Sequence, residues 1–175
     1  MTNSISLTKL NSGLLLITIL FITNPVFAAN CALPKIKDSV TKTCVKANTQ
    51  AGTIGLAGSG VAKTDEFAVT CETGTQFLTV GVLDKAVPKR STNLSIQIIK
   101  PGSSASSQAT DYTDDAKYSA LVKLNGAAGL YSVLVNKPSY VGAESANKGA
   151  ENYIALFSCR SAANRQLGTS VITTQ

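Results

Sequence analysis

Apolar side chains recur at every second position in one short segment after another from residue 65 onward. Successive side chains of a β-strand point to opposite faces, so this period of two predicts half-buried strands. No segment in this part of the chain keeps a helical period for three turns. Many short strands without helices predict an all-β protein, an antiparallel β-sandwich of jelly-roll-like form. The predicted strands lie within 67–71, 76–84, 94–98, 118–124, 130–137 and 153–159.

The predicted strands present an apolar face to the core, and the segments between them contain turn residues. Residues 125–129, with the sequence NGAAG, separate two alternating runs and predict a hairpin. Tyr118, Tyr131 and Tyr153 fall on apolar faces, so we expect them to be core or half-buried residues, whereas Tyr112 and Tyr140 fall in loops. Exposed tyrosines can stack on glycans, which makes Tyr112 and Tyr140 the candidate ligand surface.

The N-terminus has the pattern of a signal peptide. Lys9 precedes an apolar run at 14–22, and small residues follow at Val26 and Ala28. The run is shorter than the roughly 20 residues that a membrane-spanning helix needs. We therefore expect cleavage before Ala29, a signal peptide over 1–28, and a mature protein in the periplasm or outside the cell. An uncleaved anchor and a lipoprotein attached at Cys31 are the alternatives.

Four cysteines lie in the predicted mature chain, and an even number in an exported protein suggests two disulfides. We expect Cys31 to pair with Cys44 as a local bridge. Cys71 and Cys159 each end a predicted strand, so we expect a long-range bridge between them. No C-x-x-C motif is present, which argues against thiol-redox catalysis and a zinc knuckle.

Residues 29–64 differ from the remainder of the mature chain. They contain five lysines against one acid, Asp38, and glycine recurs through 50–64, which predicts turns or a mobile connection. We therefore divide the mature protein into a basic N-terminal segment, 29–64, and a β-sandwich domain, 65–175. The basic segment suits an anionic partner such as a membrane surface or an acidic polysaccharide, and an ordinary soluble surface is the alternative interpretation. Only three arginines and an exported address argue against nucleic acid.

The order of strands and turns resembles the bacterial pre-peptidase C-terminal domain, a β-sandwich appended to secreted enzymes. The resemblance spans about residues 65–160. It rests on DEFAV at 65–69, Gly74, LTVGV at 78–82, LSIQI at 94–98, GLYSVLV at 129–135 and NYIAL at 152–156. It implies an accessory or binding role, sometimes with calcium. The family usually has Asp-x-Asp before the strand that begins here at Leu94, whereas this chain has Ser-Thr-Asn at 91–93.

Asp111, Asp114 and Asp115 form the densest acidic cluster in the chain. Calcium takes six to eight oxygen ligands, which clustered aspartates on a loop can supply. The spacing is not that of an EF-hand, and a solvated turn is the alternative interpretation. If the family resemblance holds, Asp84 and Asn93 are further candidate ligands. Calcium is the only cofactor that the sequence suggests.

The composition excludes several catalytic chemistries. The chain has no histidine, which rules out Ser-His-Asp and Cys-His catalysis and histidine-ligated zinc. A Ser-x-x-Lys spacing at Ser39 and Lys42 matches penicillin-recognising enzymes, but their Lys-Thr-Gly element is missing. We therefore expect a non-enzymatic exported protein that binds an envelope protein or a polysaccharide. A structural subunit of a surface assembly and a small carboxylate-based hydrolase are the alternatives.

Overall fold

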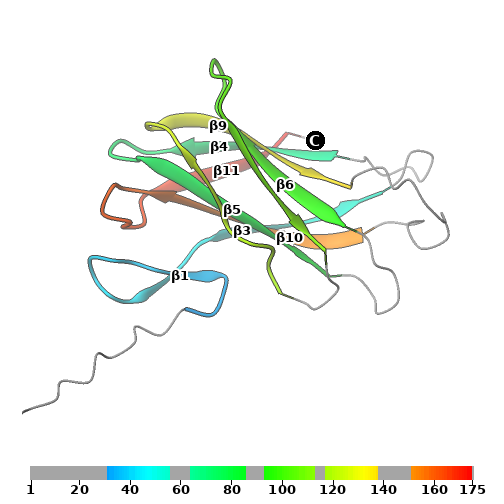
Figure 1. Ribbon diagram of the computed structural model, residues 1–175, viewed down its shortest axis with the longest axis horizontal. Helices are drawn as coiled ribbons and strands as arrows, with labels where there is room; N and C mark the ends of the chain where they lie inside the picture. Colours follow the sequence, from blue (N-terminus) through cyan, green and yellow to red (C-terminus); the bar gives the residue numbers. More distant parts are fainter. Residues whose placement is uncertain (1–30, 56–63, 86–92, 113–116, 138–150, 175) are drawn as a thin grey trace, which may run out of the picture.

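The computed structural model describes residues 31–55, 64–85, 93–112, 117–137 and 151–174. These residues form two antiparallel sheets packed face to face, with a small third sheet beside them (Figure 1). The predicted all-β sandwich is confirmed. None of the described residues belongs to a helix of the length and apolar character that crossing a bilayer requires. The predicted signal peptide lies outside the described residues.

The strands follow a crossed order within each sheet. In the four-stranded sheet the order is β3 (Asn48–Ile54), β10 (Glu151–Arg160), β5 (Phe77–Asp84) and β8 (Val122–Asn125). The five-stranded sheet has the order β11 (Thr169–Thr173), β4 (Thr64–Cys71), β9 (Gly129–Asn136), β6 (Leu94–Ile99) and β7 (Ser106–Asp111). The small sheet pairs β1 (Lys35–Lys37) with β2 (Cys44–Lys46).

The core lies between the two large sheets and consists of the apolar faces that the alternation predicts. Phe67 packs against Tyr153 and Phe157, with ring centroids 6.5 and 5.2 Å apart. The predicted burial of Tyr131 and Tyr153 is confirmed, and Tyr118 is half-buried. Each large aliphatic or aromatic side chain removed from water contributes about 1.5–3 kcal/mol of stability. The buried members from the central strands include Val69, Leu78, Val80, Ile96, Ile98, Val133 and Val135.

Both predicted disulfides are present. Cys71 on β4 is bonded to Cys159 on β10, with their Cα atoms 5.6 Å apart. These strands belong to different sheets, so we call this bond the inter-sheet disulfide. Cys31 is bonded to Cys44, the first residue of β2, which closes the small sheet. Disulfides persist in oxidising environments, so both bonds agree with a location outside the cytoplasm.

The predicted hairpin at 125–129 is wrong, because this segment crosses from one sheet to the other. β8 pairs with β5, whereas β9 pairs with β4 and β6. The Tyr131 hydroxyl donates a hydrogen bond to the Ala127 carbonyl at 2.8 Å, and Lys100 Nζ lies 3.8 Å from the centre of the same ring. A tyrosine that bonds back to the upstream backbone is a known device at corners of β-sandwiches. The turn residues therefore make a corner.

Turns were expected over residues 50–64, but the first part of this segment, as far as Ile54, belongs to strand β3. β3 pairs with β10 along its length, and Gly52 lies opposite Tyr153. A β-carbon on Gly52 would lie 2.7 Å from Cε1 of the tyrosine and nearer still to its hydroxyl. The glycine thus makes room for a fully buried ring rather than for a turn. The N-terminal segment therefore contributes an edge strand to the sandwich.

The strand predicted at 118–124 begins only at Val122. The Ser119 hydroxyl accepts a hydrogen bond from the Val82 N–H at 3.1 Å, and the Ser119 N–H donates to the Val82 carbonyl at 2.7 Å. Leu121 covers Gly81, where a β-carbon would lie 2.8 Å from its side chain. These local contacts interrupt the regular alternation of inward and outward side chains, so that the Leu121 side chain is 38% exposed. β7 and β11 were not predicted, because neither has a full apolar alternation.

Candidate functional site

Arg160 attaches the small sheet to the sandwich. It is the last residue of β10, and its side chain is completely buried. The guanidinium donates from Nη2 to the carbonyls of Lys37, at 2.5 Å, and Asn164, at 2.7 Å. Its Nε donates to Asn164 Oδ1 at 2.9 Å. Burial lowers the pKa of Arg160, and nearby Asp38 opposes that shift.

Asp38 makes the second attachment. Its carboxylate accepts hydrogen bonds from the N–H groups of Val40 and Thr41 within the small sheet, and from the Gln166 N–H at 3.0 Å. These backbone bonds, that of Thr41 above all, lower the pKa of Asp38 to about 2. The Gln166 side chain in turn donates to the Lys46 carbonyl at 2.9 Å. The small sheet is therefore fixed at both of its strands to the turn that follows β10.

A groove runs between the small sheet and the irregular segment before β8. It consists of two adjoining pockets, of about 340 and 320 Å³, which share Leu33. Leu121 and Tyr118 turn outward into it because the segment 118–121 is not a regular strand. We call it the lysine groove. Its lining is Cys31, Leu33, Lys35, Ile36, Lys37, Leu83, Lys117, Tyr118, Leu121 and Asn164.

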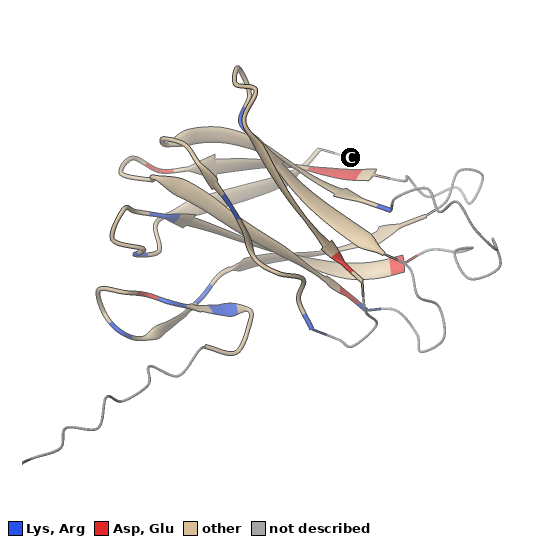
Figure 2. Ribbon diagram, in the orientation of Figure 1, with Lys and Arg blue, Asp and Glu red and all other residues tan. Residues whose placement is uncertain are grey.

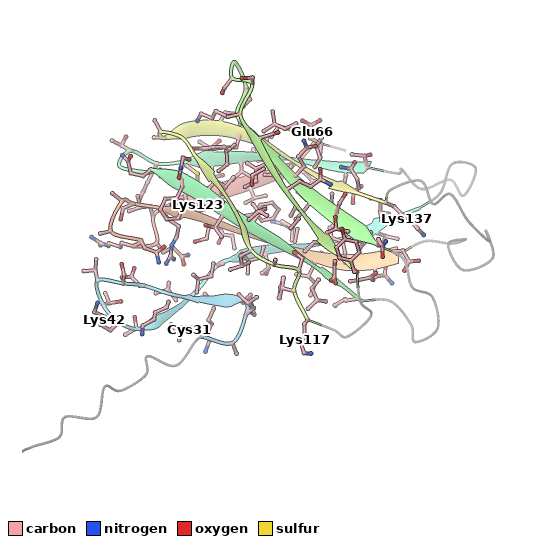
Figure 3. The ribbon with its side chains drawn as sticks, in the orientation of Figure 1. Cys31, Lys42, Glu66, Lys117, Lys123 and Lys137 are labelled. Carbon is pink, nitrogen blue, oxygen red and sulfur yellow. A yellow bond between two sulfur atoms is a disulfide. The ribbon has the colours of Figure 1, made fainter. Side chains whose placement is uncertain are left out.

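The lysine groove combines an apolar lining with positive charge. Lys35, Lys37 and Lys117 line it, and none of its described lining residues is a carboxylate. Basic segments gather along the small sheet, and Figure 3 shows Lys117 on the same side of the molecule as Cys31 (Figures 2 and 3). Burial raises the pKa of the Tyr118 hydroxyl, which keeps it a neutral donor. The groove can therefore attract an anion while covering an apolar group.

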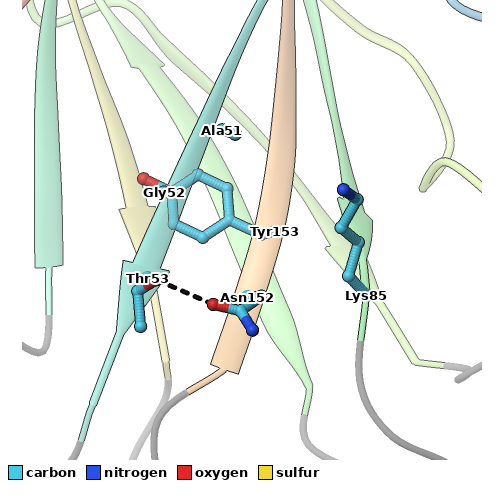
Figure 4. Close-up of a pocket in the computed structure, with 6 residues that line it drawn as sticks. All are labelled: Ala51, Gly52, Thr53, Lys85, Asn152 and Tyr153. Carbon is cyan, nitrogen blue, oxygen red and sulfur yellow. Dashed lines mark hydrogen bonds between the residues drawn. The ribbon is translucent and has the colours of Figure 1, made fainter.

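A second, more polar pocket of about 360 Å³ lies where β3 meets β10 (Figure 4). The Thr53 hydroxyl donates to Asn152 Oδ1 at 2.7 Å, and Lys85 lies at the side of the pocket. The Tyr153 ring lies beside Gly52 and closes the pocket toward the core. None of the described residues that line this pocket is a large aliphatic side chain, so it can cover an apolar group less well than the lysine groove.

Buried carboxylates gather at the end of the sandwich opposite the corner. Asp65, Asp84, Asp111 and Glu151 lie where β4 and β10 begin and where β5 and β7 end. Glu151 accepts a hydrogen bond from Lys137 at 3.2 Å in a buried ion pair, and Asp65 accepts one from the Tyr153 hydroxyl. Asp111 Oδ2 accepts from the Asp84 N–H at 3.2 Å. Burial and Asp65 both raise the pKa of Tyr153.

The acidic cluster predicted for calcium is only partly described. Asp111 is buried at the end of β7 beside Asp84, while Asp114 and Asp115 lie outside the described residues. Within the described ranges, no group of three or more histidine, cysteine or acidic side chains could hold a metal ion. Calcium binding stays a prediction. Of the two surface tyrosines, Tyr112 is 70% exposed and Tyr140 lies outside the described residues.

The sequence indicated only part of the lysine groove. The excess of lysine in the N-terminal segment suited either an anionic partner or an ordinary soluble surface, and two of the three groove lysines belong to that segment. Nothing in the pattern indicated that Lys117 and Leu121, about 85 residues later, would face them. A scan against protein-family models and a search of curated proteins each found no match. The resemblance to the pre-peptidase C-terminal domain therefore stays a prediction.

Proposed function

We propose that the protein is a non-enzymatic binding module, working outside the cytoplasm, that holds an anionic ligand with an apolar portion in the lysine groove. The observation that carries this proposal is the presence of Lys35 and Lys37 together with four aliphatic side chains around one groove, with no carboxylate among its described lining residues. The disulfides support the location, because such bonds persist in oxidising compartments.

The charges and the apolar lining have separate roles in this proposal. Lys35 and Lys37 attract the anionic group, and their long side chains let the ammonium groups reach over the rim. Leu33, which lines both pockets, covers the apolar part of the ligand. A single-chain anionic amphiphile combines both chemistries, whereas a small inorganic anion offers only the first.

Three probes separate these contributions in isothermal titration calorimetry. Dodecyl phosphate, used below its micelle concentration, carries both an anionic group and an alkyl chain. Inorganic phosphate carries the anionic group alone, and dodecyl maltoside carries the alkyl chain without a charge. We expect saturable binding of dodecyl phosphate and much weaker binding of the other two. Chemical-shift changes in NMR spectra should centre on Leu33 and Leu121.

A matched pair of double variants tests the position of the site. Lys35→Glu with Lys37→Glu reverses two groove lysines, whereas Lys42→Glu with Lys85→Glu makes the same change in net charge on exposed residues outside the groove lining. We expect the first pair to weaken binding of dodecyl phosphate about tenfold or more, and the second pair to change it little. If both pairs weaken the binding of dodecyl phosphate equally, the ligand is attracted by the overall charge of the protein and not by the lysine groove, which would refute the proposal.

A further inference from the structure

Strand β11 is an edge of the five-stranded sheet, and it lacks the features that usually protect such an edge. Edge strands commonly carry charged residues, proline or a bulge, which oppose pairing with another chain. The sequence of β11 is Thr-Ser-Val-Ile-Thr, with no charge and no proline. It pairs regularly with β4 from Thr169 to Thr173, so no bulge interrupts it.

The backbone of β11 presents hydrogen-bonding groups on its open side. In an antiparallel pair, residues alternate between those bonded to the partner strand and those directed away from it. The Gly168 carbonyl accepts from Glu72, and the Thr174 N–H donates to Glu66, so even-numbered residues are directed toward β4. Thr169, Val171 and Thr173 are therefore directed outward.

One of these outward groups already has a hydrogen-bond partner, which limits the positions at which another strand can pair with β11. The Thr169 carbonyl accepts a hydrogen bond from the Asn48 side chain at the start of β3. Val171 and Thr173 remain as the outward pair on this edge. Between them, Ile172 lies on the outer face of the sheet with 63% of its side chain exposed. Among the four described edge strands of the two large sheets, β3, β7, β8 and β11, no other carries an exposed large apolar side chain.

We propose that β11 pairs with β11 of a second copy of this chain, antiparallel and centred on Ile172. In this register Val171 of one copy lies opposite Thr173 of the other, and each of the two such pairs exchanges both N–H···O=C bonds. Ile172 faces its own counterpart in the closely spaced, non-hydrogen-bonded position, where Cα atoms are about 4.5 Å apart. The two exposed isoleucines then cover one another.

The occupant is a second copy because the edge is complementary to itself. The outward groups of Val171 and Thr173 are placed symmetrically about Ile172, so one twofold axis satisfies both ends. Such an isologous contact uses the same surface on both partners and closes on itself, which gives a dimer rather than a fibre. The short strand buries little area, so the dimer is weak and in rapid exchange.

Cysteine trapping tests the register. Facing Cβ atoms in this position lie about 4.5–5.5 Å apart, close to the range in which a disulfide forms. We expect Ile172→Cys to give a covalent dimer under mild oxidation, with peptide mapping that joins the two introduced thiols. Gln108→Cys, on the opposite edge strand β7, is the matched control and should trap far less dimer.

Sedimentation equilibrium tests the same interface without a covalent bond. Thr173→Pro removes an outward N–H and leaves the bonds to β4 in place, and Ile172→Lys adds a charge at the twofold axis. We expect the wild-type protein to dimerise at about 0.5 mM, each variant to weaken dimerisation about tenfold, and Gln108→Lys to leave it unchanged. Thermal melts show whether each variant is folded. A wild-type protein that stays monomeric, or equal trapping at residues 108 and 172, would overturn the proposal.

Discussion

Replacing Arg160 by methionine should release the small sheet from the sandwich. Methionine keeps the length and apolar stem of the side chain but removes every donor. The Lys37 and Asn164 carbonyls would each lose a charged hydrogen-bond partner, as would Asn164 Oδ1. The variant therefore isolates the polar attachment from the packing.

The magnitude follows from the number of acceptors left without a donor. A buried polar group that loses its partner costs about 1–3 kcal/mol, and adjacent losses are not additive. The two carbonyls and the amide oxygen around Arg160 together give about 3–5 kcal/mol. Asn164 is exposed on its outer side, so water can replace part of that loss. We therefore expect about 3 kcal/mol for Arg160→Met.

Urea unfolding combined with amide hydrogen exchange measures this effect. We expect a lower free energy of unfolding, with protection lost first in β1 and β2, and weaker binding in the lysine groove because Lys37 and Asn164 line it. Arg165→Met is the matched control, since Arg165 is exposed. A loss below about 1 kcal/mol, or exchange that rises evenly over the whole protein, would refute the argument that Arg160 holds the small sheet.

Four further outcomes test other parts of the structure. Gly52→Ala should destabilise the protein by about 1–3 kcal/mol in urea unfolding, because the new methyl group meets the Tyr153 ring. Replacing both cysteines of the inter-sheet disulfide by alanine should cost about 4–5 kcal/mol, since the bond closes a loop of 88 residues. The folded-state pKa of Asp38 is about 2, against 3.8 ordinarily, so its attachment persists above pH 4 and is lost as the pH falls toward 2. Hydrogen exchange in β1 at acidic pH would show this loss, and Asp38→Asn should abolish that pH dependence. If the acidic cluster binds calcium, millimolar calcium should raise the melting temperature by several degrees, and Asp114→Ala with Asp115→Ala should remove that shift.

The alternation of side chains was enough to predict the fold class and most of the core. Strands such as β5 and β9 are central, so one face must be apolar and the period of two is strong. β7 and β11 are edge strands with serine and threonine at many positions, and their strand character comes from pairing with a neighbour. The corner at 126–128 has hairpin residues, yet Tyr131 and the packing of two sheets determine its path.

The candidate site was less accessible to prediction from the sequence. The two disulfides could be anticipated, because each cysteine of the inter-sheet bond ends an alternating run. The lysine groove depends on Arg160, whose buried guanidinium positions the small sheet. From the sequence alone, a charged residue at the end of an apolar strand is interpreted as a surface residue, because arginine is rarely buried without partners. Two of its partners are backbone carbonyls, which leave no pattern in the sequence.

The crossed order of the four-stranded sheet has a consequence for how the chain is synthesised. β10 lies between β3 and β5, yet Thr53 of β3 and its neighbour Asn152 are 99 residues apart. A chain that emerges from the ribosome N-terminus first therefore exposes the edges of β3 and β5 long before β10 exists. If these two strands paired directly with each other, β10 could not insert between them, and the sheet would be misfolded.

Insertion of β10 beside β5 brings Cys159 next to Cys71, so the native arrangement of strands favours the inter-sheet disulfide. Non-local pairing of this kind slows folding. The local bond between Cys31 and Cys44 spans 13 residues and can close much earlier. Once formed, the bond between Cys71 and Cys159 ties β10 to β4 and so opposes a direct pairing of β3 with β5 in its place.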